Sequence, residues 1–293
     1  MNGMESKLIV ITGCDSGIGK SLAEVMLKRG YSVAVSYLDK NHFEEAGNAY
    51  PWKMDVMNTE EVEAFCSYVK KLCRGGIKLE AVVMNAGIAI TGPVENLPMD
   101  FYRKCMEINF FAPVRMIKEF IPEIIRNKGR IMVIGSLAGK IALPFLSAYA
   151  SSKYAAEAFC DSLRRELNPF GVKTILMEPG AVATPIWNKG KAQDISFVDE
   201  KYLSCLTRER DSFVNGGNSG VDVDVAAFDI SQILMAKNPR PRYIIAKNMA
   251  ASKFLLIVPD RILDKAIEKV FHMDYGNKGK KRRRFHERKS VRS

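Results

Sequence analysis

The sequence is poor in histidine and shows no paired spacing of cysteines. Its three histidines lie far apart, and its six cysteines are scattered along the chain. A zinc site needs several such ligands at short spacing, and a disulfide framework needs paired cysteines. The sequence therefore predicts neither a metal centre nor a disulfide scaffold, and it offers no histidine-activated nucleophile.

A long apolar run is also missing. No stretch of eighteen apolar residues indicates a membrane-spanning helix, and no apolar leader precedes the first strand-like segment. We therefore expect an intracellular protein that is cytoplasmic or is held peripherally at a membrane.

Acidic side chains are scarce at the carboxyl end. The net charge is +11, and residues 278–293 carry nine basic side chains against one glutamate, which gives +8 and leaves +3 for residues 1–277. Only Phe285 interleaves with these charges, so base stacking is not indicated and nucleic acid is not favoured as a partner. This basic tail follows an apolar segment, residues 251–277. The tail is either a disordered, solvated end or part of a peripheral membrane contact.

Short apolar runs alternate with amphipathic segments along most of the chain. Apolar, β-branched runs are typical of strands in a parallel sheet that is covered on both faces. The alternation predicts an α/β fold with a doubly wound, mostly parallel sheet of seven strands and helices on both faces. The expected strands are 7–13, 31–36, 49–56, 79–87, 129–136, 171–180 and 242–247, and the clearest helices are 18–29, 59–74, 101–125 and 148–167.

One domain accounts for this pattern. We assign residues 1–250 to a single catalytic domain, in which residues 184–220 fit the alternation poorly and are expected to form a mobile flap over a site. The apolar segment 251–277 and the basic tail 278–293 follow it.

The stretch TGCDSGIGK, residues 12–20, joins the first strand to the first helix. Glycines at positions 13, 17 and 19 let the backbone turn sharply and approach a ligand, and free N–H groups at a helix start attract phosphate. The stretch is either a dinucleotide phosphate loop or an ordinary strand-to-helix turn.

Tyr149 and Lys153 stand four residues apart on a predicted helix, so they share one face. A free tyrosine has a pKa of about 10, which makes its phenolate scarce at neutral pH. A neighbouring ammonium favours the phenolate and would suit the tyrosine to accept the proton of an alcohol. The alternative is a tyrosine and a lysine that are merely exposed on a helix.

These motifs and others in the same order resemble those of the short-chain dehydrogenase/reductase family of the classical type. The resemblance covers roughly residues 6–250 and includes NAG at 85–87, IN at 108–109, Ser136, and PG at 179–180 before Thr184. It implies a Rossmann fold and hydride transfer between a nicotinamide cofactor and a hydroxyl or carbonyl group.

The resemblance also implies a role for each site residue. Tyr149 is the general acid/base, Lys153 also holds the nicotinamide ribose, Ser136 donates a hydrogen bond to the substrate oxygen, and Asn109 anchors a water in the proton path. The remaining cofactor-binding residues are expected to be Thr12, Gly13, Asp15, Ser16, Gly17, Ile18, Gly19, Asp39, Asp55, Val56, Asn85, Ala86, Gly87, Pro179, Gly180, Val182 and Thr184.

The choice between NAD and NADP is expected at the end of the second strand. By family spacing the deciding acid or arginine would fall at Tyr37 or Leu38, and neither residue type is present. Asp39 is an acid, but it lies slightly after the position that the family spacing gives for the deciding residue. Asp15 occupies a position where NADP-using members often carry a base, so NAD is favoured over NADP.

The subgroup of retinol, hydroxysteroid and 3-hydroxybutyrate dehydrogenases is nearest in motif. It suggests a hydrophobic alcohol or ketone that is steroid-, retinoid- or lipid-like, with apolar walls from Ile186, Trp187, Phe197 and Tyr202. Two alternatives stay open: an NADP-dependent carbonyl reductase of small or 3-hydroxy acid substrates, and a non-catalytic dinucleotide sensor. The family also implies a homodimer or homotetramer.

Overall fold

The computed structural model describes residues 6–270 of the chain. Its sheet has seven strands, all parallel, in the order β3-β2-β1-β4-β5-β6-β7. This confirms the predicted α/β fold in one domain, with an all-parallel sheet in place of a mostly parallel one. The strands are β1 (Lys7–Ile11), β2 (Ser32–Tyr37), β3 (Ala49–Lys53), β4 (Lys78–Met84), β5 (Arg130–Ile134), β6 (Lys173–Pro179) and β7 (Arg242–Ile245).

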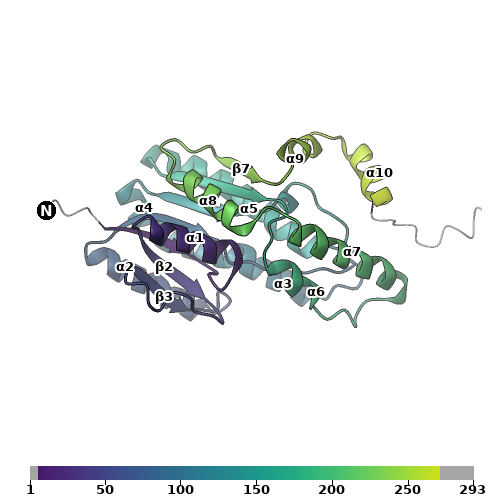
Figure 1. Cartoon of the computed structure of the whole chain (residues 1–293), viewed down its shortest axis with the longest axis horizontal. Helices are drawn as coiled ribbons and strands as arrows, with labels where there is room; N and C mark the ends of the chain where they lie inside the picture. Colours follow the sequence, from purple (N-terminus) through teal and green to yellow (C-terminus); the bar gives the residue numbers. More distant parts are fainter. Residues whose placement is uncertain (1–5, 271–293) are drawn as a thin grey trace, which may run out of the picture.

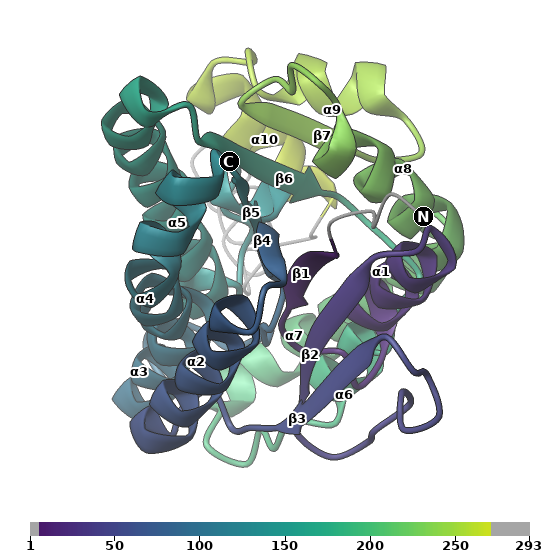
Figure 2. The same cartoon turned by 90° about the vertical axis from the view of Figure 1, so that its left-hand side faces the viewer.

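Helices cover both faces of the sheet (Figure 2). One face packs α2 (Thr59–Arg74), α4 (Ala112–Asn127) and α5 (Ser147–Leu167), and the other packs α1 (Gly17–Lys28) and α8 (Val223–Met235). Successive residues of a strand point to opposite faces. Leu8 and Val10 therefore join the first of these two cores, and Ile9 and Ile11 join the second.

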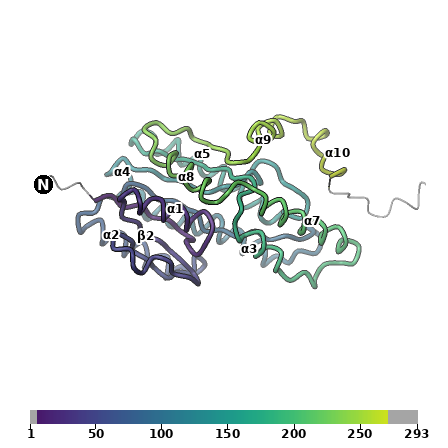
Figure 3. The backbone as a smooth tube through the Cα atoms, viewed as in Figure 1, coloured from purple at the N-terminus to yellow at the C-terminus, as the bar shows by residue number. Residues whose placement is uncertain are grey.

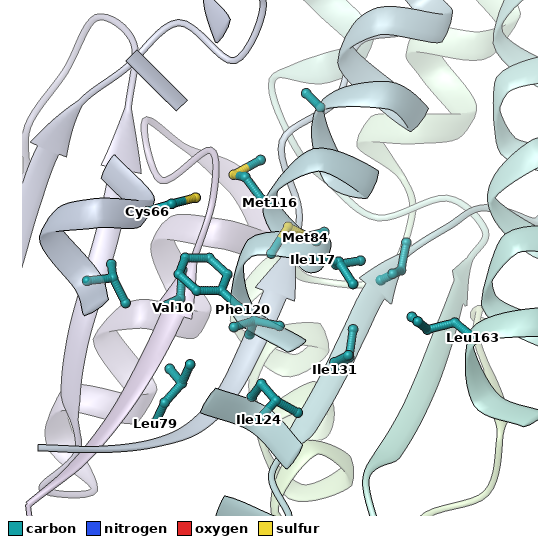
Figure 4. Packing of buried hydrophobic residues seen from close by; sticks show 14 of the residues in the cluster. Val10, Cys66, Leu79, Met84, Met116, Ile117, Phe120, Ile124, Ile131 and Leu163 are labelled. Carbon is teal, nitrogen blue, oxygen red and sulfur yellow. The ribbon is translucent and has the colours of Figure 1, made fainter. Parts of the chain in front are cut away.

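Apolar residues at helical spacing in α4 form part of the core on the face covered by α2, α4 and α5. Met116, Ile117, Phe120 and Ile124 are fully buried and lie over the sheet beside Ile131 of β5 (Figure 4). Positions three and four apart share one helix face, so a single stripe of α4 covers the central strands.

The predicted helix 101–125 is interrupted. The structure has α3 (Met99–Met106), a π-helical turn (Glu107–Phe111) and then α4. A π-helical turn inserts one extra residue per turn and is frequent at functional sites. It changes the direction in which the residues of this turn, including Asn109, point. Short 3₁₀ turns follow β5 (Leu137–Gly139) and α5 (Asn168–Phe170).

Residues 184–220 contain more regular structure than the sequence pattern indicates. They form α6 (Ile186–Lys191) and α7 (Glu200–Asn218), which lie beyond one end of the sheet (Figure 1). The α7 sequence mixes charges with its apolar residues, which hides its helical period, but Cys205, Leu206 and Glu209 are buried at helical spacing. That this flap is mobile stays a prediction.

Two short helices end the described chain. They are α9 (Met249–Leu255) and α10 (Asp260–Val270), and both lie at the periphery of the molecule (Figures 1 and 3). Within residues 6–270, no helix has the length and the apolar composition needed to cross a bilayer. The basic tail, and the end of the apolar segment after residue 270, lie outside the described residues.

Candidate active site

A cavity of about 520 Å³ opens beyond the carboxyl ends of the strands. This is the edge where doubly wound sheets bind ligands. The fold brings most of the predicted residues to its wall: Gly13, Asp15, Ser16, Gly17, Ile18, Asp39, Asp55, Val56, Asn85, Ala86, Gly87, Ser136, Tyr149, Lys153, Pro179, Gly180, Val182 and Thr184. Thr12, Gly19 and Asn109 are buried and do not line the cavity.

The glycine-rich loop has the backbone that a phosphate site needs. Gly13 and Gly17 have φ values of +71° and +61°, a region that favours glycine. A Cβ at Gly13 would stand 2.8 Å from the Cα of Ala86, and one at Gly19 would stand 2.4 Å from Nδ2 of Asn85. The loop therefore packs directly on the end of β4, and the helix start beyond it can accept a pyrophosphate.

Thr12 and Asn85 hold this loop in place. The Thr12 hydroxyl accepts the backbone N–H groups of Asn85 (3.0 Å) and Ala86 (3.1 Å). The Asn85 amide donates to the carbonyls of Thr12 (2.8 Å) and Gly13 (3.1 Å). Thr12 thus supports a cofactor site from behind and does not line it.

Tyr149, Lys153 and Ser136 meet at the middle of the cavity wall. Nζ of Lys153 lies 5.7 Å from the centre of the Tyr149 ring and donates to the carbonyl of Ile134 at 2.9 Å. The Ser136 hydroxyl accepts the N–H of Ala138 at 3.1 Å and is also hydrogen-bonded to the Tyr149 side chain. One helix, α5, and the end of β5 therefore position a phenol, an ammonium and a hydroxyl together.

Burial governs the acidity of this pair. Burial raises the pKa of Tyr149, and the hydrogen bond with Ser136 only partly opposes it. Burial also lowers the pKa of Lys153 to about 8. Desolvation therefore keeps the phenol protonated in the chain alone. That the Lys153 ammonium favours the phenolate during the reaction stays a prediction.

Asn109 organises the backbone beside the lysine. Its side chain accepts the N–H of Ile88 at 2.9 Å and donates to the Ile88 carbonyl at 3.0 Å and to the Ser152 hydroxyl at 2.9 Å. A Cβ at Gly87 would lie 3.2 Å from Oδ1 of Asn109. These contacts tie α5 and the π-helical turn to the end of β4, and the water-anchoring role stays a prediction.

Acidic residues gather at the β2–β3 end of the cavity. The Asp15 carboxylate accepts the backbone N–H groups of Leu38 (3.0 Å), Asp39 (2.7 Å) and Lys40 (3.1 Å). Burial opposes ionisation of Asp15 and is the largest single influence, but these N–H groups together lower its pKa. Asp15 is therefore an anion that closes the loop after β2.

Asp39 and Asp55 have local roles at the same end. The N–H of Asp39 is bound by Asp15, and the Asp55 carboxylate accepts the N–H of Met57 at 2.9 Å. Asp55 thus shapes the turn before α2, and it also lines the cavity.

The opposite end of the cavity is apolar. Ile186 and Trp187 of α6 line it as expected, and the Trp187 indole N–H donates to the carbonyl of Val182 at 2.7 Å. Phe197 and Tyr202 are not among its lining residues. Their rings pack instead against Phe101, with centres 5.6 Å apart, and against Phe145, with centres 6.5 Å apart.

Sequence reasoning missed several lining residues. Leu143, Leu146 and Phe213 add to the apolar wall, and Arg210 of α7 adds a buried guanidinium. None of them belongs to a recognisable motif. Arg210 lies within the charged run RERD, where nothing in the sequence distinguishes it from the other charged residues.

Residues 7–194 match the short chain dehydrogenase family. The chain therefore belongs to the short-chain dehydrogenase/reductase family, and it is an NAD(P)-dependent oxidoreductase of the classical type. The sequence resemblance is thereby confirmed.

Three relatives show how broad the substrate range around this chain is. An "NADPH-dependent 3-dehydrocapnine reductase" of Ornithobacterium rhinotracheale is 32% identical and aligns over 89% of this chain and 95% of its own. "Estradiol 17-beta-dehydrogenase 2" of Mus musculus is 31% identical over 92% of this chain and 76% of its own. The mitochondrial "D-beta-hydroxybutyrate dehydrogenase" of Rattus norvegicus is 30% identical over 81% of this chain and 76% of its own.

A solved structure agrees on the fold. A short-chain dehydrogenase from Streptomyces avermitilis superposes with a TM-score of 0.74, at 22% identity, over 92% of this chain and 98% of the other. Hydroxybutyrate and hydroxysteroid dehydrogenases are thus distant relatives of this NAD(P)-dependent enzyme, and they do not determine its substrate.

Proposed function

We propose that this enzyme interconverts the hydroxyl and carbonyl forms of a hydrophobic, lipid-like substrate. The observation that carries the proposal is the meeting of the Tyr149 phenol, the Lys153 ammonium and the Ser136 hydroxyl on a cavity wall whose far end is apolar. The cofactor supplies or accepts the hydride. The chain supplies the proton transfer and the orientation of the substrate.

Each residue has a distinct part in this proposal. Ser136 orients the substrate oxygen, and Tyr149 gives that oxygen a proton in reduction or takes one from it in oxidation. Lys153 holds the nicotinamide ribose and, when protonated, favours the phenolate. Because burial raises the pKa of Tyr149, the phenol keeps its proton at neutral pH, which suits reduction of a ketone.

A panel of substrates tests the proposal. Purified enzyme is assayed with steroid, retinoid, long-chain and small ketones and alcohols, each with NAD(H) and NADP(H). Turnover of the long apolar compounds supports the proposal, whereas turnover of small carbonyl compounds alone favours the small-substrate reductase. Tight dinucleotide binding with no turnover in the panel favours the sensor. Light scattering of the same preparation decides the homodimer or homotetramer, which stays a prediction.

We further propose that NAD is the preferred cofactor. The carboxylate of Asp15 stands at the end of β2, where the 2′ position of the adenosine ribose is read in this fold. Its charge would repel a 2′-phosphate, and it already occupies the backbone N–H groups of Leu38, Asp39 and Lys40. One relative is described as NADPH-dependent, so a preference for NADP is the competing hypothesis.

Asp15→Asn is expected to raise the preference for NADP over NAD by roughly 10- to 100-fold. The change removes one negative charge and keeps an oxygen that can accept the loop N–H groups. Repulsion between a carboxylate and a phosphate a few ångströms apart costs about 1–3 kcal/mol. The ratio of kcat/KM for the two cofactors measures the effect. Asp100→Asn is the control, because its carboxyl is exposed and does not line the cavity. An unchanged ratio in Asp15→Asn would show that the charge does not select the cofactor.

A second proposal concerns the end of the described chain. Apolar side chains of α9, of α10 and of the turn between them face solvent, with Phe254 64% exposed, Ile257 76% and Ile262 60%. In α10 the apolar residues 262, 263, 266, 267 and 270 fall on one arc of the helix, and none of them is buried. An amphipathic helix of this kind lies in a membrane surface with its apolar face down. We infer that α9 and α10 make a peripheral contact with a bilayer.

Phe254→Ser with Ile257→Ser is expected to weaken vesicle binding by roughly 100-fold or more. Burial of one large apolar side chain contributes about 1.5–3 kcal/mol, and two are lost. Sedimentation with phosphatidylcholine vesicles, with and without phosphatidylserine, measures it. Val94→Ser with Phe170→Ser is the control pair, because these side chains are similarly exposed elsewhere. Equal sedimentation of both double variants would refute the contact.

A further inference from the structure

The charges on the cavity wall are divided between its two ends. The acidic lining residues are Asp15, Asp39 and Asp55, which all follow β1, β2 or β3. The basic lining residues come from the other half of the fold, namely Lys153 on α5, Lys189 and Lys191 on α6, and Arg210 on α7. The end expected to hold the substrate therefore has basic lining residues and, in the described part of the chain, no acidic ones, although its walls are largely apolar.

Arg210 is the unusual member of this group. Its residue is only 5% exposed, and its Nη2 donates to the carbonyls of Gly190 (3.0 Å), Lys191 and Gln193 (2.7 Å). Its Nε is buried and has no hydrogen-bond partner within residues 6–270. A buried donor without a partner costs about 1–3 kcal/mol, and more when it is charged.

No carboxylate among the described residues pairs with this guanidinium at ion-pair distance. The nearby Asp211 forms an ion pair with Lys191 instead, at 2.6 Å. Arg210 thus carries a buried positive charge that is bound only by neutral carbonyl oxygens. Buried charges in proteins are normally paired, so an unpaired one beside a ligand cavity indicates a ligand of opposite charge.

We propose that Arg210 binds an anionic group of the substrate, so that the substrate is an amphiphile with an apolar body and an acidic end. This inference rests on the proposed function and narrows its substrate class to oxo or hydroxy compounds that carry a carboxylate or sulfonate. Nε, the donor of the guanidinium fork that has no partner among the described residues, can donate to one oxygen of either anion, since Nη2 is already bound by carbonyls. Ile186 and Trp187 line the same end of the cavity and contact the apolar body.

Part of Arg210 clearly serves the fold, because Nη2 binds the last carbonyls of α6 and the loop after it. A purely structural arginine and a substrate-binding one differ in a measurable way. Loss of the fold contact lowers activity toward all substrates alike, whereas loss of the anion contact lowers activity only toward charged ones.

The test uses pairs of substrates of equal size. Each 3-oxo acid of short, medium and long chain is compared with its uncharged primary amide, and an oxo-alkanesulfonate of medium chain is a further arm. The full-length enzyme is expected to prefer the acid in kcat/KM. Arg210→Gln is expected to lower kcat/KM for the acid by roughly 100-fold more than for the amide, because both substrates lose the fold contact and only the acid loses the anion contact.

Arg210→Lys is expected to restore part of the preference, because it keeps the charge without the fork of donors. Lys189→Gln is the matched control. It removes a charge from an exposed lining residue, and it should lower kcat/KM for the acid only slightly. Equal losses for acid and amide in Arg210→Gln would overturn the inference, as would a wild-type enzyme that does not distinguish the two.

Calorimetric titration of the same pairs separates this inference from the proposed function. If the wild-type enzyme binds the acid more tightly than the amide and Arg210→Gln loses this difference, the anion subsite is supported even where no turnover is found. Absence of turnover then counts only against the proposed reaction. Equal affinities of acid and amide would overturn the subsite even where both are turned over.

Discussion

Tyr149→Phe is expected to lower kcat by roughly 1,000-fold in both directions, within the range of about 10²- to 10⁴-fold that proton transfer by a positioned side chain contributes. The substitution keeps the ring and removes only the hydroxyl that would exchange a proton with the substrate. Because burial raises the pKa of this phenol, wild-type oxidation should accelerate toward alkaline pH, and this pH dependence should disappear in the variant. Steady-state kinetics across the pH range measure both effects.

The matched control is Tyr154→Phe. Tyr154 lies on the same helix, is 44% exposed and donates to the carbonyl of Lys140, but it does not line the cavity. Its loss should change kcat by no more than about twofold, as for surface substitutions in general. If Tyr149→Phe retained wild-type activity, the proposed general acid/base would be excluded.

Lys153→Met is expected to have opposite effects on activity and stability. Activity should fall by at least about 100-fold, because the proposed proton partner and ribose ligand are lost. The free energy of unfolding at pH 7 should rise by roughly 1–3 kcal/mol. Burial lowers the pKa of Lys153 from 10.5 to about 8, so holding it charged below that pH costs about 1.4 kcal/mol for each pH unit of the difference. The lost hydrogen bond to Ile134 offsets about 1 kcal/mol of the gain.

The pH dependence of stability identifies the cause. The folded chain binds the lysine proton less tightly than the unfolded chain, so this residue makes wild-type stability rise between about pH 8 and pH 10.5. Urea unfolding at pH 7 and at alkaline pH should therefore show that Lys153→Met exceeds wild type at the lower pH and loses its advantage at the higher one. Lys118→Met, an exposed surface control, should follow wild type at both. A Lys153→Met variant less stable than wild type at pH 7 would contradict the argument.

These two predictions concern residues that the sequence already pointed to. The i, i+4 spacing of Tyr149 and Lys153 settles their common face, because α-helix geometry is local. The glycines of the glycine-rich loop were equally visible in the sequence, and Gly13 and Gly17 have the positive φ values that favour this residue. Such patterns depend only on residues that are close together in the sequence. The order of the strands and helices could be predicted for the same reason.

The acidity of the site was not visible in the sequence. The two residue types and their spacing indicated that the ammonium favours the phenolate, but they did not report that burial raises the pKa of Tyr149 and lowers that of Lys153. Burial depends on what packs around α5 from distant parts of the chain, so no local pattern reports it. The same holds for Phe197 and Tyr202, whose rings pack among the flap and its neighbours and do not reach the cavity.

The sequence by itself determined the alternation of strands and helices, the glycine-rich turn after the first strand and the helical Tyr149–Lys153 pair, because each depends on residues close together in the chain. Only the tertiary structure decided that Asp15 closes the loop after β2 and that Arg210 is buried at the cavity with an unpaired Nε. Both depend on segments far apart in sequence, and a buried charge acquires its chemistry from the neighbours that folding gives it.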